Sequence, residues 1–242
     1  MNKLILNFKS KDSKKIKDPK NFLGGKGANL SEMGRMGLPV PPGFTISTKV
    51  CEIFYKDKKK LNSKLISQIK KEIKTIEKDV SKKFGDLKNP LLLSVRSGAR
   101  VSMPGMMDTI LNLGLNDKTV VALANKTSNG RFAKDSYRRF IQMYGNVVMG
   151  VESYNFEELI ENYKLTKGVL LDTDLDEEDW DGLINDFKNV VKEKTSKDFP
   201  QDVYHQLFGA ISAVFLSWES KRAKVYRKLN QIPSEWGTAV NV

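Results

Sequence analysis

The sequence predicts a mixed α/β (α+β) protein in which a strand-containing first part is followed by a helical second part. Short apolar runs typical of strands occur at Leu4–Phe8, Leu91–Val95 and Ile110–Leu113. From Asn116 to Asn230, apolar residues recur every three to four positions with only short breaks, which is typical of helices. A last β-type run begins at Trp236. Strands therefore gather early and at the end of the chain, and helices occupy the remainder.

Length and charge limit the classes of function without choosing among them. The 242 residues suit one large or two modest domains, and a hydrophobic content of 40% is enough for a core. Lys and Arg together number 41 against 29 Asp and Glu, which gives a net charge of +12. Such an excess attracts anions, among them nucleotides, nucleic acid and acidic surfaces.

Cysteine and histidine usage points to a reducing compartment and away from a histidine-rich metal site. The single cysteine, Cys51, cannot form an internal disulfide, and its apolar neighbours predict a small core residue rather than a nucleophile. The single histidine, His205, excludes a His-rich metal cluster. No apolar run approaches 18 residues, and the first residues are too short a run for a signal peptide. We therefore expect a cytoplasmic protein without a membrane span.

A glycine-rich stretch follows the first strand and a polar loop at Lys9–Lys20. Gly24, Gly25, Lys26 and Gly27 precede a helical pattern. A glycine turn with a lysine at a helix start can hold phosphate through free N–H groups and an ammonium. The stretch does not match the P-loop pattern. From the residues alone, a phosphate site and a loop that happens to contain a lysine both remain open.

The segment up to residue 90 supplies a strand and two helices. Three prolines make Leu38–Gly43 extended and rigid, and Phe44–Thr48 is rich in β-forming residues. Helices are predicted at Lys49–Lys59 and Ser63–Lys82, the second with lysines opposite its apolar face. These lysines alternate with acids and lack an aromatic ladder, which favours solvated helix faces over a nucleic-acid stripe.

The central stretch combines a buried strand with a loop that could hold phosphate. The run Leu91–Val95 ends in Arg96, and Arg100 follows it. A tract rich in Ser, Gly and Thr then leads to the second run. Guanidinium groups fork onto phosphate oxygens, and glycine lets backbone N–H groups approach an anion. The pattern indicates a polyphosphate site, and an ordinary loop between strands with surface arginines remains the alternative.

Five helices are predicted in the second part of the chain. The last is a long helix in which Val225 and Leu229 continue a core-facing stripe, with His205 on another side. The acidic run that begins at Asp176 is expected to complement the dipole of its helix rather than to bind metal. The aromatic residues from Tyr137 to Tyr144 form a core face with arginines outside. The helix ranges are Lys118–Thr127, Gly130–Tyr144, Tyr154–Lys167, Asp176–Lys194 and about Gln201–Asn230.

Several motifs resemble the N-terminal region of the pyruvate, phosphate dikinase family. LGGKGANLSEM occupies Leu23–Met33, GLPVPPGFTIST occupies Gly37–Thr48, and LLLSVRSGARVSMPGMMDTILNLGLND occupies Leu91–Asp117. RFAKDSYRRFIQMYGNVVMGV and IPSEWGTAVNV extend the likeness over essentially the whole chain. The GGKG and VRS elements are shared with phosphoenolpyruvate synthases and glucan water dikinases. The SMPGMMDTILNLGLND tract is characteristic of the dikinase branch.

The resemblance implies an ATP-grasp nucleotide-binding domain. One α/β subdomain would comprise residues 1–115 with the returning segment 231–242, and a helical insertion with a connecting long helix would comprise residues 116–230. A third subdomain would lie beyond Val242, because the last β-run stops abruptly. The chain would then be a fragment of a longer enzyme.

The resemblance also assigns roles to individual residues. Lys26 and Arg96 match the ligands of the ATP phosphates, which need positive charge to offset the triphosphate. Gly105 and Thr109 fall in a flexible loop that covers the phosphates, together with Asp108. Arg100 either joins them or docks a neighbouring domain.

The implied reaction interconverts ATP, phosphate and pyruvate with AMP, pyrophosphate and phosphoenolpyruvate. A phosphohistidine on a swivelling domain carries the group to a pyruvate-binding barrel, and neither domain is expected in this chain. No catalytic or metal-binding residue is therefore expected here, and the Mg²⁺ ligands should lie mainly outside it. The chain alone should be inactive and bind ATP weakly, and the full-length enzyme should be a homodimer. Neither nucleic acid nor membrane is an expected partner.

Two alternatives compete with this interpretation. A phosphoenolpyruvate synthase would use water in place of phosphate, and the SMPGMMDT loop disfavours it. A basic helical nucleic-acid-binding protein would explain the net charge of +12 but would leave the glycine loops without a role.

Overall fold

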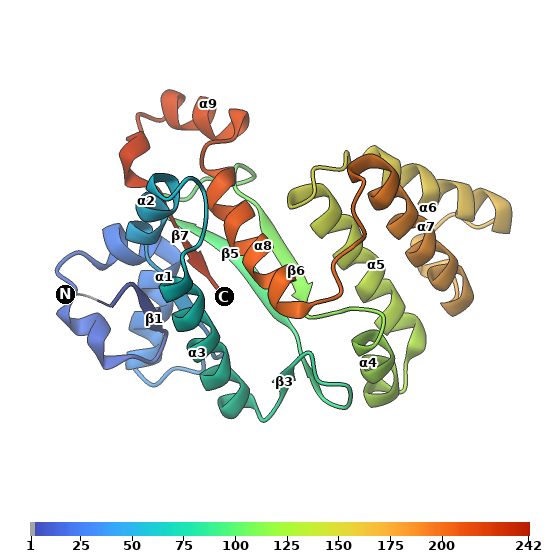
Figure 1. Ribbon diagram of the computed structural model, residues 1–242, viewed down its shortest axis with the longest axis horizontal. Coiled ribbons are helices and arrows are strands. Elements are labelled where there is room, and N and C mark those ends of the chain that lie inside the picture. The colour runs from blue at the N-terminus through green and yellow to red at the C-terminus, as the bar shows by residue number, and fades with distance from the viewer. Residues whose placement is uncertain (1–2) are drawn as a thin grey trace. The chain divides into compact units, whose positions relative to one another are not determined.

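Short strands from distant parts of the chain pair into an antiparallel sheet (Figure 1). The computed structural model describes residues 3–242. Strand β1 (Ile5–Asn7) pairs with β2 (Phe44–Ile46), which pairs with β7 (Thr238–Asn241). Strand β7 pairs in turn with β5 (Leu93–Ala99). The predicted first strand lies at the edge of this sheet, and the predicted β-runs at Phe44 and after Trp236 are confirmed.

The described residues fall into two compact units. The first consists of residues 3–81, 94–109 and 211–242, and the second of residues 82–93 and 110–210. Helix α8 (Val203–Ser217) contributes residues to both units. The subdomain boundaries proposed from the sequence stay a prediction.

In the first unit, helices cover the sheet and bury its apolar side chains. Helices α1 (Pro19–Arg35) and α2 (Thr48–Lys56) both pack on β7 (Figure 1). The other helices here are α3 (Ser63–Val80) and α9 (Lys221–Leu229). The predicted loop at Lys9–Lys20 instead contains the 3-10 helix η1 (Lys11–Lys15) and the start of α1. Asp18 explains that start, because its side chain accepts a hydrogen bond from Asn21 N at 3.0 Å and caps the helix.

In the second unit, helices pack around an aromatic core. The rings of Tyr137, Phe140, Tyr144 and Phe199 meet mostly edge to face, and Phe156 meets Phe187 in the same way. Helix α5 packs against α4 and α7, and α6 packs against α7. Helix α6 has the bounds that the sequence predicts. The elements are β3 (Lys83–Phe84), β4 (Pro90–Leu91), β6 (Thr109–Leu113), α4 (Thr119–Thr127), α5 (Gly130–Val147), α6 (Tyr154–Lys167), η2 (Asp172–Asp174) and α7 (Glu177–Thr195).

The predicted long helix from Gln201 to Asn230 is wrong, because the chain turns after Ser217. Helix α9 starts anew behind Ser220, whose side chain accepts a hydrogen bond from Ala223 N at 3.3 Å. Val225 and Leu229, predicted to face the core, are 52% and 78% exposed. Their spacing continues that of α8, so periodicity alone cannot show the break.

The acidic run at the start of α7 caps that helix, as predicted. The Asp176 carboxylate accepts hydrogen bonds from the backbone N–H groups of Glu178 at 2.9 Å and Asp179 at 3.0 Å. The Asp179 carboxylate accepts in return from Asp176 N at 3.0 Å, which completes a capping box. This arrangement lowers the pKa of the Asp176 carboxyl, chiefly through the backbone hydrogen bond from Asp179.

Arg138 of α5 is buried, although the sequence analysis predicted that Arg138 and Arg139 would both lie outside the core. Arg138 is 4% exposed and pairs with Asp135 at 2.8 Å and with Asp172 at 3.1 Å. Its guanidinium also lies 4.4 Å from the centre of the Trp180 ring. The ring and the two carboxylates replace the water that an exposed arginine would bind.

Replacing Arg138 by Met should destabilise the protein by about 2 kcal/mol, because Asp135 and Asp172 lose their buried partner and each keep only a longer ion pair, to Arg139 at 3.1 Å and to Lys164 at 3.4 Å. The matched control is Arg139→Met, whose side chain is 59% exposed and whose loss should cost under about 0.5 kcal/mol. Urea unfolding of both variants measures the difference. Equal costs would show that the buried pair contributes nothing beyond an ordinary surface arginine.

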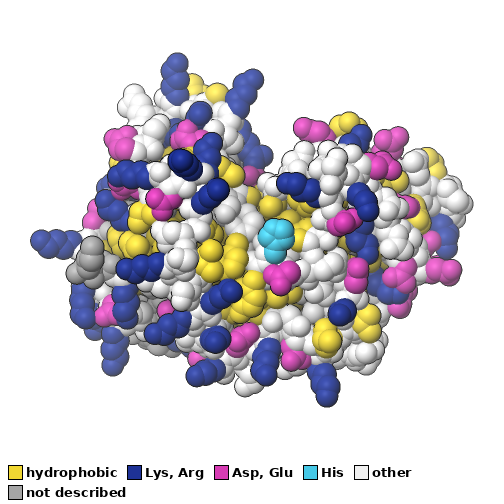
Figure 2. All heavy atoms as spheres, in the orientation of Figure 1, with side chains coloured by type: hydrophobic (Ala, Val, Ile, Leu, Met, Phe, Trp, Pro, Cys, Tyr) yellow, Lys and Arg dark blue, Asp and Glu magenta, His cyan; other side chains and the backbone are white. Residues whose placement is uncertain are grey.

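Basic side chains are dispersed on the face of the molecule drawn in Figure 2. Lys and Arg alternate there with Asp and Glu instead of forming one stripe. On α2, for example, Glu52 pairs with Lys49 at 3.4 Å and Lys56 at 2.7 Å. This agrees with the interpretation of these lysines as solvated helix faces. Within residues 3–242, no helix has the length and apolar character needed to cross a membrane.

Candidate phosphate-binding site

The glycine-rich stretch breaks α1 and starts a new helical segment. Gly24 has φ 70° and ψ 170°, a conformation open essentially only to glycine. The hydroxyl of Thr48 donates to the carbonyl of Asn21 at 2.8 Å, and Phe22 O lies 3.4 Å from it. A side chain thus occupies carbonyls that a continuous helix would use. The first N–H groups after the break have no acceptor within the new segment, which suits an anion.

Glycines let this new segment lie directly on the sheet. A Cβ at Gly24 would stand 1.6 Å from the carbonyl oxygen of Gly98 in β5. A Cβ at Gly27 would stand 2.7 Å from the hydroxyl of Thr45 in β2. Larger residues would lift the segment off the strands. The GGKG stretch and the arginine-bearing strand β5 are therefore neighbours, although about 70 residues separate them in the sequence.

Lys26 and Arg96 come together at this junction. Lys26 lies between Gly25 and Gly27, and Arg96 lies on β5 two residues before Gly98. Burial lowers the pKa of the Lys26 amine, and the charge of Arg96 lowers it further. Both residues are nonetheless exposed, so an anion can reach them. Two adjacent cations repel each other, and an anion between them relieves that repulsion.

The lowered pKa predicts unusual reactivity of Lys26. At pH 8 a larger fraction of its amine is neutral than in an ordinary lysine, so an acylating reagent should modify Lys26 faster than the exposed Lys20 on the first part of α1. Arg96→Gln should slow the modification of Lys26 in part, because burial remains the larger cause. Peptide mass spectrometry after a short exposure measures both rates. Equal rates at Lys26 and Lys20 would contradict the effect.

The loop with Gly105, Asp108 and Thr109 docks on α9 and the turn before it. Met103 is buried in a cluster with Trp218, Ala223 and Ile232. The guanidinium of Arg222 donates to Met106 O at 3.2 Å and pairs with the Asp108 carboxylate. Gly105 has φ 72° and open space around it. Thr109, predicted to lie in the flexible loop, is instead the first residue of strand β6, because it continues the apolar β-run Ile110–Leu113, and it is half-buried. The structure therefore places this loop in contacts of its own beside α9.

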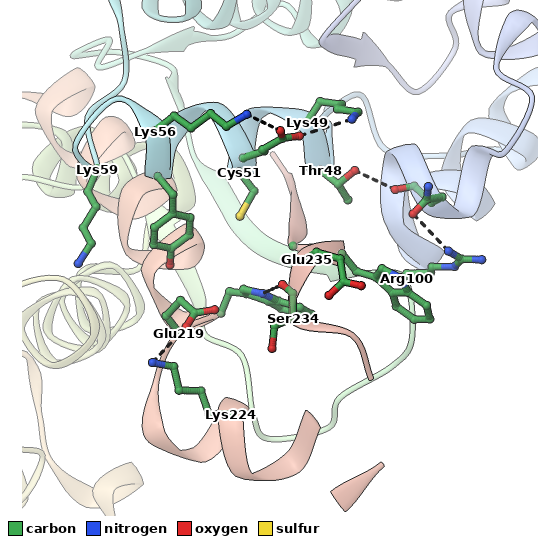
Figure 3. Close-up of a pocket in the computed structure, with 16 residues that line it drawn as sticks. Thr48, Lys49, Cys51, Lys56, Lys59, Arg100, Glu219, Lys224, Ser234 and Glu235 are labelled. Carbon is green, nitrogen blue, oxygen red and sulfur yellow. Dashed lines mark hydrogen bonds and ion pairs between the residues drawn. The ribbon is translucent and has the colours of Figure 1, made fainter. Parts of the chain in front are cut away.

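Arg100 lies at a cavity of about 940 Å³ in the first unit, and not in the cluster of Lys26 and Arg96 (Figure 3). Its guanidinium stands 4.4 Å from the centre of the Trp236 ring, donates to Asn21 Oδ1 at 3.3 Å and lies 3.8 Å from an Asp18 carboxylate oxygen. Lys224 and Glu219 line the other side and pair with each other at 3.1 Å (Figure 3). These contacts occupy Arg100 with the protein's own groups.

Cys51 also lines this cavity wall but is unsuited to nucleophilic catalysis. It is 1% exposed, and burial raises the pKa of its thiol to about 11. The prediction of a small core residue is confirmed. His205 is exposed, and its backbone N–H donates to the Asp202 carboxylate at 2.7 Å. Within residues 3–242, no group of three or more His, Cys, Asp or Glu side chains could hold a metal ion.

Two polar residues beneath the glycine-rich segment, Thr45 and Asn241, were not predicted from the sequence. Thr45 on β2 and Asn241 on β7 lie beneath Gly27, and the Thr45 hydroxyl donates to Asn241 Oδ1 at 2.8 Å. Both side chains are buried. The available signal was an asparagine within the apolar run of the last strand, a position where a polar residue needs a partner.

Two cations, a helix start and glycine backbone are groups of the kind that bind phosphate. The chain belongs to the family described as "Pyruvate phosphate dikinase, AMP/ATP-binding domain", whose profile matches residues 20–69 and 58–242. It is 54% identical over 224 residues to the pyruvate, phosphate dikinase of Clostridium symbiosum. The aligned region makes up 92% of this chain and 26% of the Clostridium protein.

Two further relatives show the same relation. The chloroplastic pyruvate, phosphate dikinase of Flaveria pringlei is 52% identical over 240 residues, which is 99% of this chain and 25% of the length of the Flaveria protein. The pyruvate, phosphate dikinase of Rhizobium meliloti is 50% identical over 242 residues, or 100% of this chain and 27% of its own. The chain thus spans about a quarter of the length of these curated relatives.

Proposed function

We propose that this chain is the ATP-binding part of a pyruvate, phosphate dikinase, and that Lys26 and Arg96 hold the phosphates of ATP. The convergence of these two residues at a glycine-lined helix start carries the proposal. Family membership supports it, since the matching family is an AMP/ATP-binding domain. The reaction interconverts ATP, phosphate and pyruvate with AMP, pyrophosphate and phosphoenolpyruvate.

The two cations would act on charge that increases during phosphoryl transfer. A triphosphate needs positive groups at its oxygens both for binding and for stabilising the transferred group. The Arg96 guanidinium can fork onto two phosphate oxygens, and the Lys26 ammonium adds a point charge. The first N–H groups after Gly24 point their dipoles at the same anion.

The loop of Gly105, Asp108 and Thr109 would cover the phosphates after leaving its contacts on α9. Its Thr hydroxyl and glycine N–H can then donate to phosphate oxygens. The pairing of Asp108 with Arg222 supports this proposal, because it would hold the loop aside until ATP binds. Arg100 would serve to fix the wall formed by Trp236 and not to bind phosphate.

The later steps would use groups outside these 242 residues. Phosphoryl transfer to a histidine and onward to pyruvate would take place on a swivelling domain and a barrel of a full-length enzyme, which we propose to be a homodimer. His205 lies on α8 and has no part in this transfer. Mg²⁺ would bind with the ATP phosphates and supply further positive charge there. Among the described residues, no cluster of three or more His, Cys, Asp or Glu side chains could hold it by itself.

A reducing compartment such as the cytoplasm is the proposed location. The buried free thiol of Cys51 supports it. Some relatives are chloroplastic by name, and that compartment remains a feature of those proteins.

Titration with Mg-ATP, followed by NMR of the ¹⁵N-labelled chain, tests the proposal. We expect dose-dependent shifts concentrated at Gly24–Gly27 and Arg96, with weak affinity. Adenosine at the same concentrations should leave these resonances in place, because it lacks the phosphates. Shifts confined to the cavity around Trp236 would contradict the assignment. A full-length enzyme that forms phosphoenolpyruvate and AMP without depending on phosphate would favour the synthase alternative.

A further inference from the structure

Three side chains stand side by side across the sheet under the new segment of α1. Asn241 of β7 is the register partner of Thr45 in β2 and of Arg96 in β5. Partners in register point to the same face with Cβ atoms about 4.5–5.5 Å apart. The row therefore runs from a buried hydroxyl through a buried amide to an exposed guanidinium.

The amide of Asn241 has a fixed orientation within this row. Its Oδ1 accepts the hydrogen bond of the Thr45 hydroxyl at 2.8 Å. Its Nδ2 lies on the other side, 2.6 Å from the place where a Cβ on Gly98 would stand. Because Gly98 has no side chain, the amide can occupy that space. The donor end of the amide is thus turned toward strand β5, which carries Arg96.

This donor lacks an acceptor among the described residues. Asn241 is 5% exposed, and its Nδ2 is buried without a hydrogen-bond partner. A buried unpaired donor is unfavourable, and in native proteins such groups call for an explanation, for instance a ligand that is absent. The surroundings exclude a cation, since Lys26 and Arg96 supply positive charge nearby. An anionic oxygen is the acceptor that fits.

We propose that Asn241 is a third phosphate ligand, whose Nδ2 donates a hydrogen bond to an oxygen of the phosphate held by Lys26 and Arg96. This inference rests on the proposed function and adds a residue to its site. Glycines above and beside the amide let the phosphate and the backbone approach it closely. The Thr45 hydroxyl keeps the amide from turning its oxygen toward the anion, which would repel it.

Titration of the wild-type chain with inorganic tripolyphosphate and with ATP tests this donor. The side-chain ¹⁵NH₂ resonance of Asn241, assigned in the wild-type chain through its scalar coupling to the Asn241 backbone, should shift with both ligands, together with Arg96. Asn241→Asp keeps the shape but replaces the donor by a carboxylate, so both ligands should bind about ten- to a hundredfold more weakly. Thr45→Val removes the hydrogen bond that orients the amide but keeps the donor, so it should weaken binding clearly less than Asn241→Asp does.

The outcomes separate the two proposals. If Arg96 and the Lys26 segment respond to tripolyphosphate while the Asn241 amide stays in place, the donor role is overturned and the proposed function stands. If Thr45→Val weakens binding as much as Asn241→Asp, the pair is only structural, and the donor role is again overturned. If none of these groups responds to ATP or tripolyphosphate, the phosphate site itself is wrong. The wild-type shifts decide even if a variant fails to fold.

Discussion

Replacing Lys26 or Arg96 by Ala should weaken ATP binding by about ten- to a hundredfold for each residue, because each removes a charge-assisted contact to phosphate oxygens. Lys20→Ala removes an equivalent charge from the first part of α1 and should leave the affinity within about twofold. NMR titration with Mg-ATP measures all three, since it records weak binding. The double variant should lose less than the product of the single losses, because both residues hold the same group.

Adenosine provides the internal control for this prediction. Its binding should be equal in wild type, Lys26→Ala and Arg96→Ala, since neither residue is proposed to contact the nucleoside. A parallel loss of adenosine and ATP would mean that the substitutions disturb the fold and do not remove phosphate ligands.

Replacing Gly24 by Ala should be the most destabilising single-methyl change in the first unit. The new Cβ would stand 1.6 Å from Gly98 O, and the backbone at φ 70°, ψ 170° is strained for any other residue. Steric overlap and backbone strain each cost about 1–3 kcal/mol, so the free energy of unfolding should fall by about 2–6 kcal/mol.

The adjacent glycine supplies a matched control. A Cβ at Gly25 would stand 3.4 Å from Arg100 O, so Gly25→Ala should cost under about 1 kcal/mol. Urea unfolding of both variants gives the comparison. If the Gly24→Ala protein were as stable as the Gly25→Ala protein, the conformation of Gly24 would not be needed for α1 to pack on the sheet.

The sequence predicted most elements because their signals are local. Helix α6 ends at Gly168, a left-handed residue that closes helices, and its predicted bounds are those observed. The capping box that starts α7 is equally local, since Asp176 and Asp179 lie within one turn. Such features depend on neighbours in the chain, which a sequence displays directly.

Features that depend on tertiary contacts were missed or misplaced. The turn between α8 and α9 interrupts a periodic pattern that continues in register, and only burial shows that Val225 and Leu229 are exposed. Arg138 is buried because Trp180 and Asp172 come from other elements. The break at Gly24 depends on Gly98, far away in the sequence.

The residues of the candidate site show the same difference between local and tertiary signals. Lys26 and Arg96 were predicted as phosphate ligands from their motifs, and the structure places them close enough for the charge of Arg96 to act on Lys26. Thr45 and Asn241 could not be identified, because pairing of β2, β7 and β5 sets them in one row. Arg100 and Asp108 lie near the motif in sequence but face Trp236 and Arg222 in the structure.

The separation of half-reactions in a full-length dikinase tests the role of Lys26 and Arg96 most directly. Isotope exchange between ATP and its products reports the step at this site, and exchange between pyruvate and phosphoenolpyruvate reports the distant one. We predict that Lys26→Ala and Arg96→Ala each abolish the first exchange and leave the second at its wild-type rate. Loss of both exchanges together, or survival of the first, would contradict the assignment of these residues to the ATP phosphates.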